Sequence, residues 1–263
     1  MVVADLHAHT TVSDGTLTLE TLPAAADRAG VDVVALTDHD RLHPGLDEPV
    51  STVGGVTVVR GIELRVETAA ERVDLLGYGV TETDALSEEC DRLQRDRVDR
   101  GRRIIEAVEA ELGVDLDVEP REGLGRPHIA RAIADSDAPY DVDRAFDELI
   151  GDDGPCFVPR DVTPFDRGVD LLREACDLVG LAHPFRYDDP DAAIERCADL
   201  DAVERFYPYD RHDVDEDPGR IEAAAVEHDL LLTGGSDAHD ERLGVAGLDR
   251  EHWHRVRDRL SGV

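Results

Sequence analysis

Two patterns of apolar and polar residues alternate along most of the chain. Short apolar runs rich in β-branched residues, which are typical of buried strands, are separated by stretches in which apolar residues recur at helical spacing. The predicted strands are residues 2–6, 31–37, 56–63, 73–80, 179–183, 202–206 and 230–233. Because such alternation is typical of α/β proteins, we expect a barrel whose strands run parallel.

Helix-end signals agree with this pattern. Residues 19–29 form the first predicted helix, with Thr18 as its N-cap and Gly30 at the position after its last turn. Pro190 and Pro218 suit the first turns of two later helices, because proline fits the start of a helix.

A segment of different character interrupts the strands. Residues 84–160 contain a long charged helix over 93–112, a loop near Gly123 and Gly125, and two further helical stretches, without a convincing strand. We therefore predict a barrel in two parts, 1–83 and 161–263, separated by a helical insertion over 84–160. No internal repeat is evident.

Composition limits the class of protein. A chain of 263 residues with 41% apolar content can bury a barrel-sized core. No apolar run approaches the roughly 20 residues that cross a bilayer, and the first residues lack the basic start of a secretion signal, so we expect a cytoplasmic protein. The four cysteines form no C-x-x-C pair and are interpreted as reduced core residues.

The charge is strongly acidic. The formal net charge is -33, and all 28 basic residues are arginine, a composition that resembles proteins of salt-accumulating archaea. A surface of this kind offers no basic stripe for duplex DNA. Binding of short single-stranded RNA ends at one site, through metal ions, remains open.

Histidines and carboxylates gather just after five of the predicted strands. In a barrel of parallel strands, these ends meet on one face, so residues distant in sequence converge there. His7 and His9 alternate in an extended segment and therefore share one face. Imidazole and carboxylate groups together suit divalent metal ions. The five segments are D-L-H-A-H followed by S-D-G, T-D-H-D, G-I-E, A-H-P and G-G-S-D-A-H.

Taken in this order, these motifs resemble the PHP (polymerase and histidinol phosphatase) family over almost the whole chain. The resemblance implies a distorted (β/α)7 TIM-like barrel with two or three divalent ions (manganese, zinc or iron, with magnesium also open) and hydrolysis of phosphate esters. It places metal ligands, and with them the catalytic centre, at eight positions: His7, His9, Asp14, His39, Glu63, His183, Asp237 and His239.

One position departs from the family pattern. Asp74 stands where the family usually has a histidine, and we expect it to act as a ninth ligand and to shift the preference toward manganese or magnesium. A first partition gives His7, His9, Glu63 and Asp237 to one ion. The second ion then takes Asp14, His39 and His183, and Asp74 with His239 completes the cluster.

The helical insertion resembles the branch that includes nucleoside 3′,5′-bisphosphate phosphatases and a 5′-to-3′ exoribonuclease. Arg126, His128 and Arg186 would then bind the substrate, because arginine binds phosphate in a bidentate manner. The remaining histidines are interpreted as solvated or structural: His43, His212, His228, His252 and His254.

The resemblance thus implies a small phosphorylated substrate, most simply a nucleotide, attacked by a metal-activated water. Three alternatives stay open: an exonuclease on short RNA or DNA ends, a histidinol-phosphate phosphatase, and a metal-stabilised binding module without catalysis.

The charge predicts salt-dependent folding. Repulsion among the acidic residues destabilises the compact state, and molar salt screens it by shortening the Debye length to about 3 Å. A thermal melt in molar potassium chloride should therefore have a higher midpoint than one in dilute buffer. Equal midpoints in the two solutions would contradict this expectation.

Overall fold

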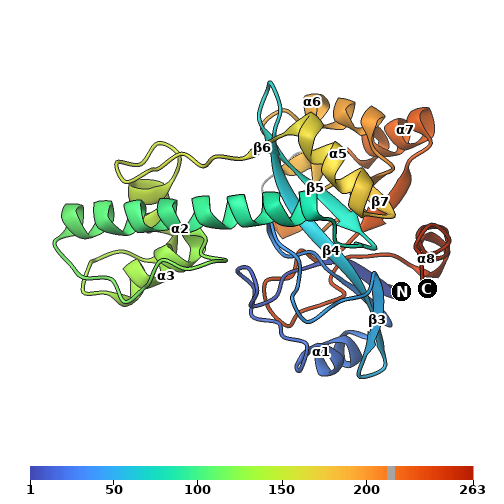
Figure 1. The fold of residues 1–263 in the computed structure, drawn as a ribbon, viewed down its shortest axis with the longest axis horizontal. Helices are drawn as coiled ribbons and strands as arrows, with labels where there is room; N and C mark the ends of the chain where they lie inside the picture. Colours follow the sequence, from blue (N-terminus) through green and yellow to red (C-terminus); the bar gives the residue numbers. More distant parts are fainter. Residues whose placement is uncertain (212–216, 263) are drawn as a thin grey trace. The chain divides into compact units, whose positions relative to one another are not determined.

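The computed structural model describes residues 1–211 and 217–262, and the sheet in it has the curled form of a distorted TIM-like barrel (Figure 1). Its strands follow the order β1-β2-β4-β5-β7-β8-β9, with β3 and β6 both paired to β4. The strands in the described residues are β1 (Ala4–Ala8), β2 (Val33–Leu36), β3 (Val50–Val53), β4 (Val56–Glu67), β5 (Arg72–Tyr78), β6 (Thr163–Pro164), β7 (Leu178–Leu181), β8 (Ala202–Phe206) and β9 (Leu231–Gly234).

The expectation of an all-parallel barrel is wrong. Strand β5 runs antiparallel to both β4 and β7, and β3 runs antiparallel to β4, whereas β1-β2-β4 and β7-β8-β9 are parallel. The reason is the short connection between β4 and β5, since a turn of a few residues can only reverse the chain. The start of β5 therefore lies beside the ends of its neighbours.

Strand β4 is joined to the second parallel group through β5, and Figure 1 shows these two as the long strands of the sheet. Its first half pairs with β2 and β3, and its second half, from Gly61 onward, pairs with β5. A Cβ atom on Gly61 would lie 2.8 Å from Thr37 Cγ2, so only glycine allows this close approach.

The longer helices are α1 (Leu22–Ala29), α2 (Asp84–Leu112), α3 (Arg126–Asp135), α5 (Phe165–Ala175), α7 (Pro218–His228) and α8 (Arg250–Arg257). Shorter helical segments are α4 (Val142–Ala145), η1 (Phe146–Ile150), η2 (Pro184–Arg186), α6 (Pro190–Glu195), η3 (Arg196–Asp199) and η4 (Tyr209–Arg211).

The helix-end predictions hold with one exception. Gly30 ends α1 in the left-handed conformation, with φ of 70°, and Pro190 and Pro218 open α6 and α7. The N-cap of α1, however, is Thr21 and not Thr18. Thr18 Oγ1 accepts a hydrogen bond from Thr21 N instead, so it supports the turn that precedes the helix.

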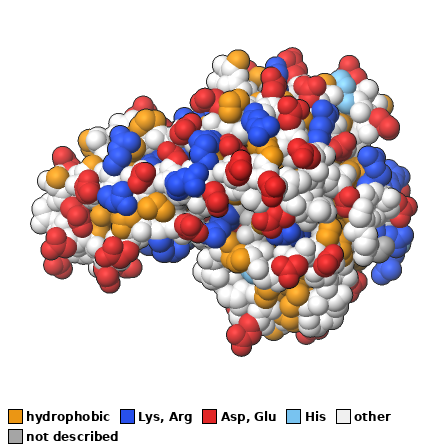
Figure 2. Space-filling view, viewed as in Figure 1, with side chains coloured by type: hydrophobic (Ala, Val, Ile, Leu, Met, Phe, Trp, Pro, Cys, Tyr) orange, Lys and Arg blue, Asp and Glu red, His pale blue; other side chains and the backbone are white. Residues whose placement is uncertain are grey.

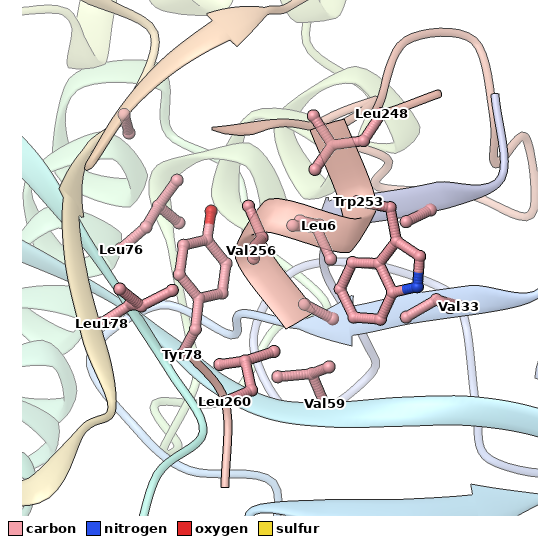
Figure 3. Close-up of a cluster of buried hydrophobic side chains, with 13 residues drawn as sticks. Leu6, Val33, Val59, Leu76, Tyr78, Leu178, Leu248, Trp253, Val256 and Leu260 are labelled. Carbon is pink, nitrogen blue, oxygen red and sulfur yellow. The ribbon is translucent and has the colours of Figure 1, made fainter. Parts of the chain in front are cut away.

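One cluster of the hydrophobic core lies at the end of the barrel where the parallel strands begin. It packs side chains of β1, β2, β4, β5 and β7 against α8, and Figure 3 shows Tyr78 and Trp253 among the aliphatic side chains. Leu6, which lies between Asp5 and His7, belongs to this cluster and is fully buried. Strand β1 therefore gives its aliphatic residue to the core while its histidines face the other way.

Contacts divide the chain into two compact units, residues 1–90 with 162–263, and residues 91–161. The first unit contains the sheet. The second is helical, with its own core around Ile104, Ile129 and Leu149, and the described residues show no strand over 84–160. Nowhere in the described chain is a helix both long enough and apolar enough to cross a bilayer.

Candidate metal centre

The ends of the strands bring all nine predicted ligands together. His7 lies in β1 and His9 directly follows it. His39 follows β2, Glu63 lies in β4, Asp74 lies near the start of β5, and His183 follows β7. Asp237 and His239 follow β9, and Asp14 lies in the turn after β1. Asp74 reaches this face because β5 runs antiparallel to its neighbours.

Backbone contacts fix these segments against one another. His9 N donates to Ala238 O at 2.9 Å, which ties the end of β1 to the loop that carries Asp237 and His239. A Cβ atom on Gly235 would lie 2.3 Å from His7 N, so this glycine lets the loop pass β1. A Cβ atom on Gly234 would likewise lie 2.5 Å from Phe206 O, so both glycines of this loop allow a close approach to neighbouring backbone.

Four sets of side chains have the geometry to hold a metal ion. Within each set, one candidate ligand atom per residue lies within 4.8 Å of the others. The sets are His9, Asp14, His39 and His239; His7, His9 and Glu63; His7, His183 and Asp237; and Glu63, Asp74 and His183.

This grouping corrects the predicted partition. His183 lies with Asp237 and His7, and not with Asp14 and His39. His239 Nε2 lies 3.3 Å from Asp14 Oδ1, so it belongs with Asp14 and not with Asp74. The sequence shows the order of the strands along the chain, whereas the partition depends on how the loop after β9 folds against β1.

Glu63 lies at the junction of these sets. Its carboxylate contacts His39 Nδ1 at 2.6 Å, His183 Nε2 at 3.1 Å and His7 Nε2 at 3.4 Å. The side chain is almost fully buried. A carboxylate between two groups of histidines has the position of a bridging ligand.

Asp74 already has a cationic partner. Arg65, which faces it across β4 and β5, donates Nε to Oδ1 at 2.7 Å and Nη2 to Oδ2 at 2.5 Å. Asp74 raises the pKa of Arg65 against the effect of burial, so the guanidinium keeps its charge. Sequence reasoning missed Arg65, although a bidentate pair of this kind is the strongest arginine–carboxylate arrangement.

A second layer of carboxylates, also missed, holds the histidines and the loops. Glu204 in β8 is fully buried, contacts His7 Nδ1 at 3.1 Å and accepts a hydrogen bond from His183 N at 2.9 Å. Asp38 accepts from Thr10 and Ser13. The sequence feature that could have identified Glu204 is a glutamate within an otherwise apolar strand. A charged side chain buried there needs a partner.

Oppositely charged groups lie next to one another in the cluster and shift each other's pKa values. Burial raises the pKa of Glu63, but His39 and His7 outweigh it and hold that pKa well below its usual range. Burial lowers the pKa of His7, but Glu204, Asp237 and Glu63 raise it well above its usual value. Acidic groups therefore stay ionised here despite burial.

The donor set fits divalent ions. His7 Nε2 and Asp14 Oδ1 are both buried and make no hydrogen bond to the described residues, although such atoms normally find a partner. Both atoms belong to the sets described above. A buried nitrogen or oxygen atom that lacks a hydrogen bond and lies within such a set is what a metal ion satisfies.

The three predicted substrate-binding residues fall in different places. Arg186 lies at this centre, where Nη1 donates to Tyr207 Oη at 2.9 Å and lies 3.4 Å from Asp237 Oδ2. Arg126 and His128 belong to the second unit, where Arg126 pairs with Asp152 and His128 Nδ1 accepts from Gly125 N.

Four of the five remaining histidines are described, and these lie outside the cluster. His43 is buried and accepts a hydrogen bond from Gly45 N, while His228 and His254 are exposed. His252 pairs with Asp249, and His212 lies outside the described residues. All four cysteines are free thiols, and three of them are buried as predicted, whereas Cys176 is only partly buried.

Comparisons with known proteins agree with the geometry. The PHP domain family matches residues 5–155. A phosphoribosyl 1,2-cyclic phosphate 1,2-diphosphodiesterase from Eggerthella lenta is 32% identical over 90% of this chain and 94% of its own. A 3′,5′-nucleoside bisphosphate phosphatase from Chromobacterium violaceum is 30% identical over 96% and 92%, respectively.

Two further relatives extend the comparison. The 5′-3′ exoribonuclease Rnm of Salmonella typhimurium is 26% identical over 96% of this chain and 90% of its own. A crystal structure from Bifidobacterium adolescentis, described as that of a metal-dependent phosphoesterase, has the same fold, with a TM-score of 0.82 at 23% identity and coverage of 100% and 98%. The chain belongs to the PHP domain family, as these matches, the distorted barrel and the ligand motifs at the strand ends together show.

Proposed function

We propose that the protein hydrolyses a phosphate ester of a nucleotide, with a nucleoside 3′,5′-bisphosphate or a similar small molecule as substrate. Membership of a family of phosphoesterases makes the chain a phosphoric ester hydrolase. The observation that carries the proposal is the largely buried cluster of five histidines and three carboxylates around Glu63.

In this proposal, the centre holds two divalent ions. His9, Asp14, His39 and His239 hold one, while His7, His183 and Asp237 hold the other, and Glu63 lies between the two sets. Manganese, zinc or iron suits this mixture of imidazole and carboxylate. Such ions, when bound, lower the pKa of a water molecule and offset charge on phosphoryl oxygens.

Arg65 is the reason for two ions instead of three. The fourth set, Glu63, Asp74 and His183, includes a carboxylate that the guanidinium already binds through both oxygens. A cation added beside Asp74 would face this fixed positive charge. We infer that Arg65 takes the place of a third ion and neutralises Asp74.

Arg186 and Tyr207 would orient the phosphate. Tyr207 Oη donates to Asp237 Oδ2 at 2.8 Å and accepts from Arg186, so the two side chains form a chain of hydrogen bonds that ends on a ligand. The Arg186 side chain is 39% exposed, so part of its guanidinium can reach a phosphoryl oxygen. No covalent nucleophile is required in this scheme.

Two related activities compete with the phosphatase. The similarity to Rnm favours an exonuclease on short RNA ends as the second candidate. The cyclic phosphodiesterase of Eggerthella lenta shows that a relative of similar length acts on a sugar phosphate, so the base need not be recognised. The protein is proposed to act in the cytoplasm.

Substrate release assays distinguish the candidates. Manganese-loaded protein in molar salt should release phosphate from 3′-phosphoadenosine 5′-phosphate and leave a 5′-phosphorylated RNA oligonucleotide intact. Stepwise shortening of the oligonucleotide would identify the exonuclease. Inactivity on both would favour a binding module.

Asp237→Asn tests the centre itself. The change removes the charge of a ligand and replaces one carboxylate oxygen by an amide nitrogen. We therefore expect kcat to fall more than about a hundredfold, which is more than the loss expected for a residue that only contacts a ligand. Asp258→Asn, on the exposed end of α8, is the matched control and should leave kcat unchanged. Near-normal turnover by Asp237→Asn would remove the centre from the mechanism.

Glu204→Gln tests the second layer. The amide keeps the shape of the side chain but loses the charge that polarises His7, so metal affinity should fall about 10–100-fold. Competition with a fluorescent chelator measures that affinity without relying on turnover. Glu222→Gln, on the exposed side of α7, should leave the affinity unchanged, and equal affinities for all three proteins would contradict the assigned role.

A further inference from the structure

An anionic substrate would approach this protein against a like charge. The formal net charge is -33, and Figure 2 shows acidic side chains spread over the face in view. Long-range attraction therefore does not bring a phosphate to the metal centre. At the centre, Arg65 is bound to Asp74 through both oxygens, whereas the Arg186 side chain is 39% exposed. Anion binding then depends on how firmly Arg186 is held.

Arg186 is held along its backbone as well as at its tip. At the tip, Nη1 donates to Tyr207 Oη at 2.9 Å. Along the backbone, Arg186 N donates to His183 O at 2.9 Å, and the next residue, Tyr187, accepts a hydrogen bond at Oη from Asp74 N at 2.8 Å. Because a side chain that is already held loses less rotamer freedom on binding, these contacts favour anion binding.

The residues that follow Tyr187 are held by Glu71, which lies in the turn between β4 and β5. Glu71 Oε2 accepts from Asp188 N at 3.0 Å, and Glu71 Oε1 accepts from Asp189 N at 2.8 Å. Figure 1 shows the tip of this hairpin beside α6, which begins directly after Asp189. Hydrogen bonds from backbone N–H groups to an ionised carboxylate are stronger than those between neutral groups. This pair of bonds, the Glu71 clamp, joins two segments of the first compact unit.

Neither segment needs the clamp in order to form. In the turn, Thr68 Oγ1 donates to Glu71 O at 2.7 Å and accepts from Glu71 N at 3.0 Å, so the backbone of Glu71 is held without its carboxylate. At the start of α6, Asp189 Oδ1 accepts from Ala192 N at 3.1 Å and caps the helix. Among the described residues, the four candidate metal sets do not include Glu71. The role of this carboxylate therefore lies in the segment that carries Arg186.

We propose that Glu71 is a positioning residue for anion binding at the metal centre. Through the clamp it fixes the backbone beside Arg186, so that the guanidinium stays near Asp237 and meets a phosphoryl oxygen of the substrate. A shift of about 1 Å in such a group is enough to weaken binding or turnover. That the anion is a phosphate ester of a nucleotide rests on the proposed function, whereas the clamp does not.

Amide hydrogen exchange tests the clamp directly, because its donors are the amides of Asp188 and Asp189. Glu71→Ala should speed up exchange at these two amides about tenfold. Glu67→Ala is the matched control and should leave this exchange unchanged, since Glu67 is an exposed glutamate of the same hairpin that pairs with Arg72 instead. Equal exchange in the wild type and Glu71→Ala would overturn the clamp.

Binding of inorganic phosphate tests the effect on Arg186. The manganese-loaded full chain, in molar potassium chloride, is titrated by calorimetry. Glu71→Ala should weaken binding about threefold to tenfold, because the arginine must then be ordered at the moment of binding. Arg186→Gln should weaken it about tenfold, because a hydrogen bond to a charged group is lost. Since Glu71 acts through Arg186, the double variant should bind within about twofold of Arg186→Gln alone.

Three results of this titration would overturn the role of Glu71. They are a wild-type protein that binds no phosphate, an unchanged affinity in Glu71→Ala, and a double variant in which the two losses add in full. Additive losses would mean that Glu71 acts on a group other than Arg186. Glu67→Ala should keep the wild-type affinity, and a loss as large as that in Glu71→Ala would contradict a specific role of the clamp.

Glu71→Gln separates the clamp from folding. The amide keeps one acceptor oxygen, so the affinity for phosphate should fall less than in Glu71→Ala. If Glu71→Ala does not fold, as shown by its thermal melt, Glu71→Gln replaces it. Unchanged exchange and unchanged affinity in that variant would then overturn the proposal.

Failure of the proposed function has a different signature. If Glu71→Ala weakens phosphate binding but the wild type hydrolyses neither 3′-phosphoadenosine 5′-phosphate nor RNA, the proposed function is refuted and the role of Glu71 stands. In an active enzyme, Glu71→Ala should raise KM about threefold to tenfold and leave kcat within about twofold, because ground-state and transition-state binding are lost equally. A fall in kcat without a rise in KM would overturn the positioning role.

Discussion

Buried charge is the constraint on which the barrel depends. Histidines and carboxylates from β1, β2, β4, β7 and the loop after β9 are buried or partly buried at one end of the sheet, where each ionised group needs an opposite charge or a hydrogen bond. Glu63 meets three histidines, and Glu204 contacts His7 and accepts from His183 N. The cluster therefore forms only when all these strand ends are in place.

The hydrophobic core supplies a driving force for folding that the charged cluster cannot supply. Apolar side chains such as Leu6, Leu76 and Trp253 pack together on the opposite side of the same strands. Burial of this area drives folding without directional requirements, while the hydrogen bonds of the cluster decide which strands lie together. Along these strands, some side chains pack in the core and others face the metal centre. The ligands are therefore held on a rigid frame, which metal binding with fixed geometry requires.

Much of this arrangement could be predicted from the sequence. The apolar runs identify seven strands, and the histidine and carboxylate motifs that follow them identify the residues that meet. What the runs could not show is strand direction, because an apolar segment reads the same for parallel and antiparallel pairing. The reversal of β5 puts Asp74 near the ligands and Arg65 beside it.

Other features depended on contacts between segments far apart in the chain. The grouping of His239 with Asp14 follows from the packing of the loop after β9 on β1, which no local pattern encodes. Glu204 and Arg65 lie within strands, where charged residues are usually interpreted as solvent-facing. Only the burial of Glu204 beside His7, and the pairing of Arg65 with the buried Asp74, show that they belong to the centre.

In the proposed function, the strand ends hold two ions and Arg65 takes the place of a third. Its most direct test is the metal content of purified protein after loading with manganese and removal of free ion, measured by elemental analysis. The account predicts two ions per chain. Three ions would contradict the role given to Arg65, and a chain that retains none would contradict the metal centre itself.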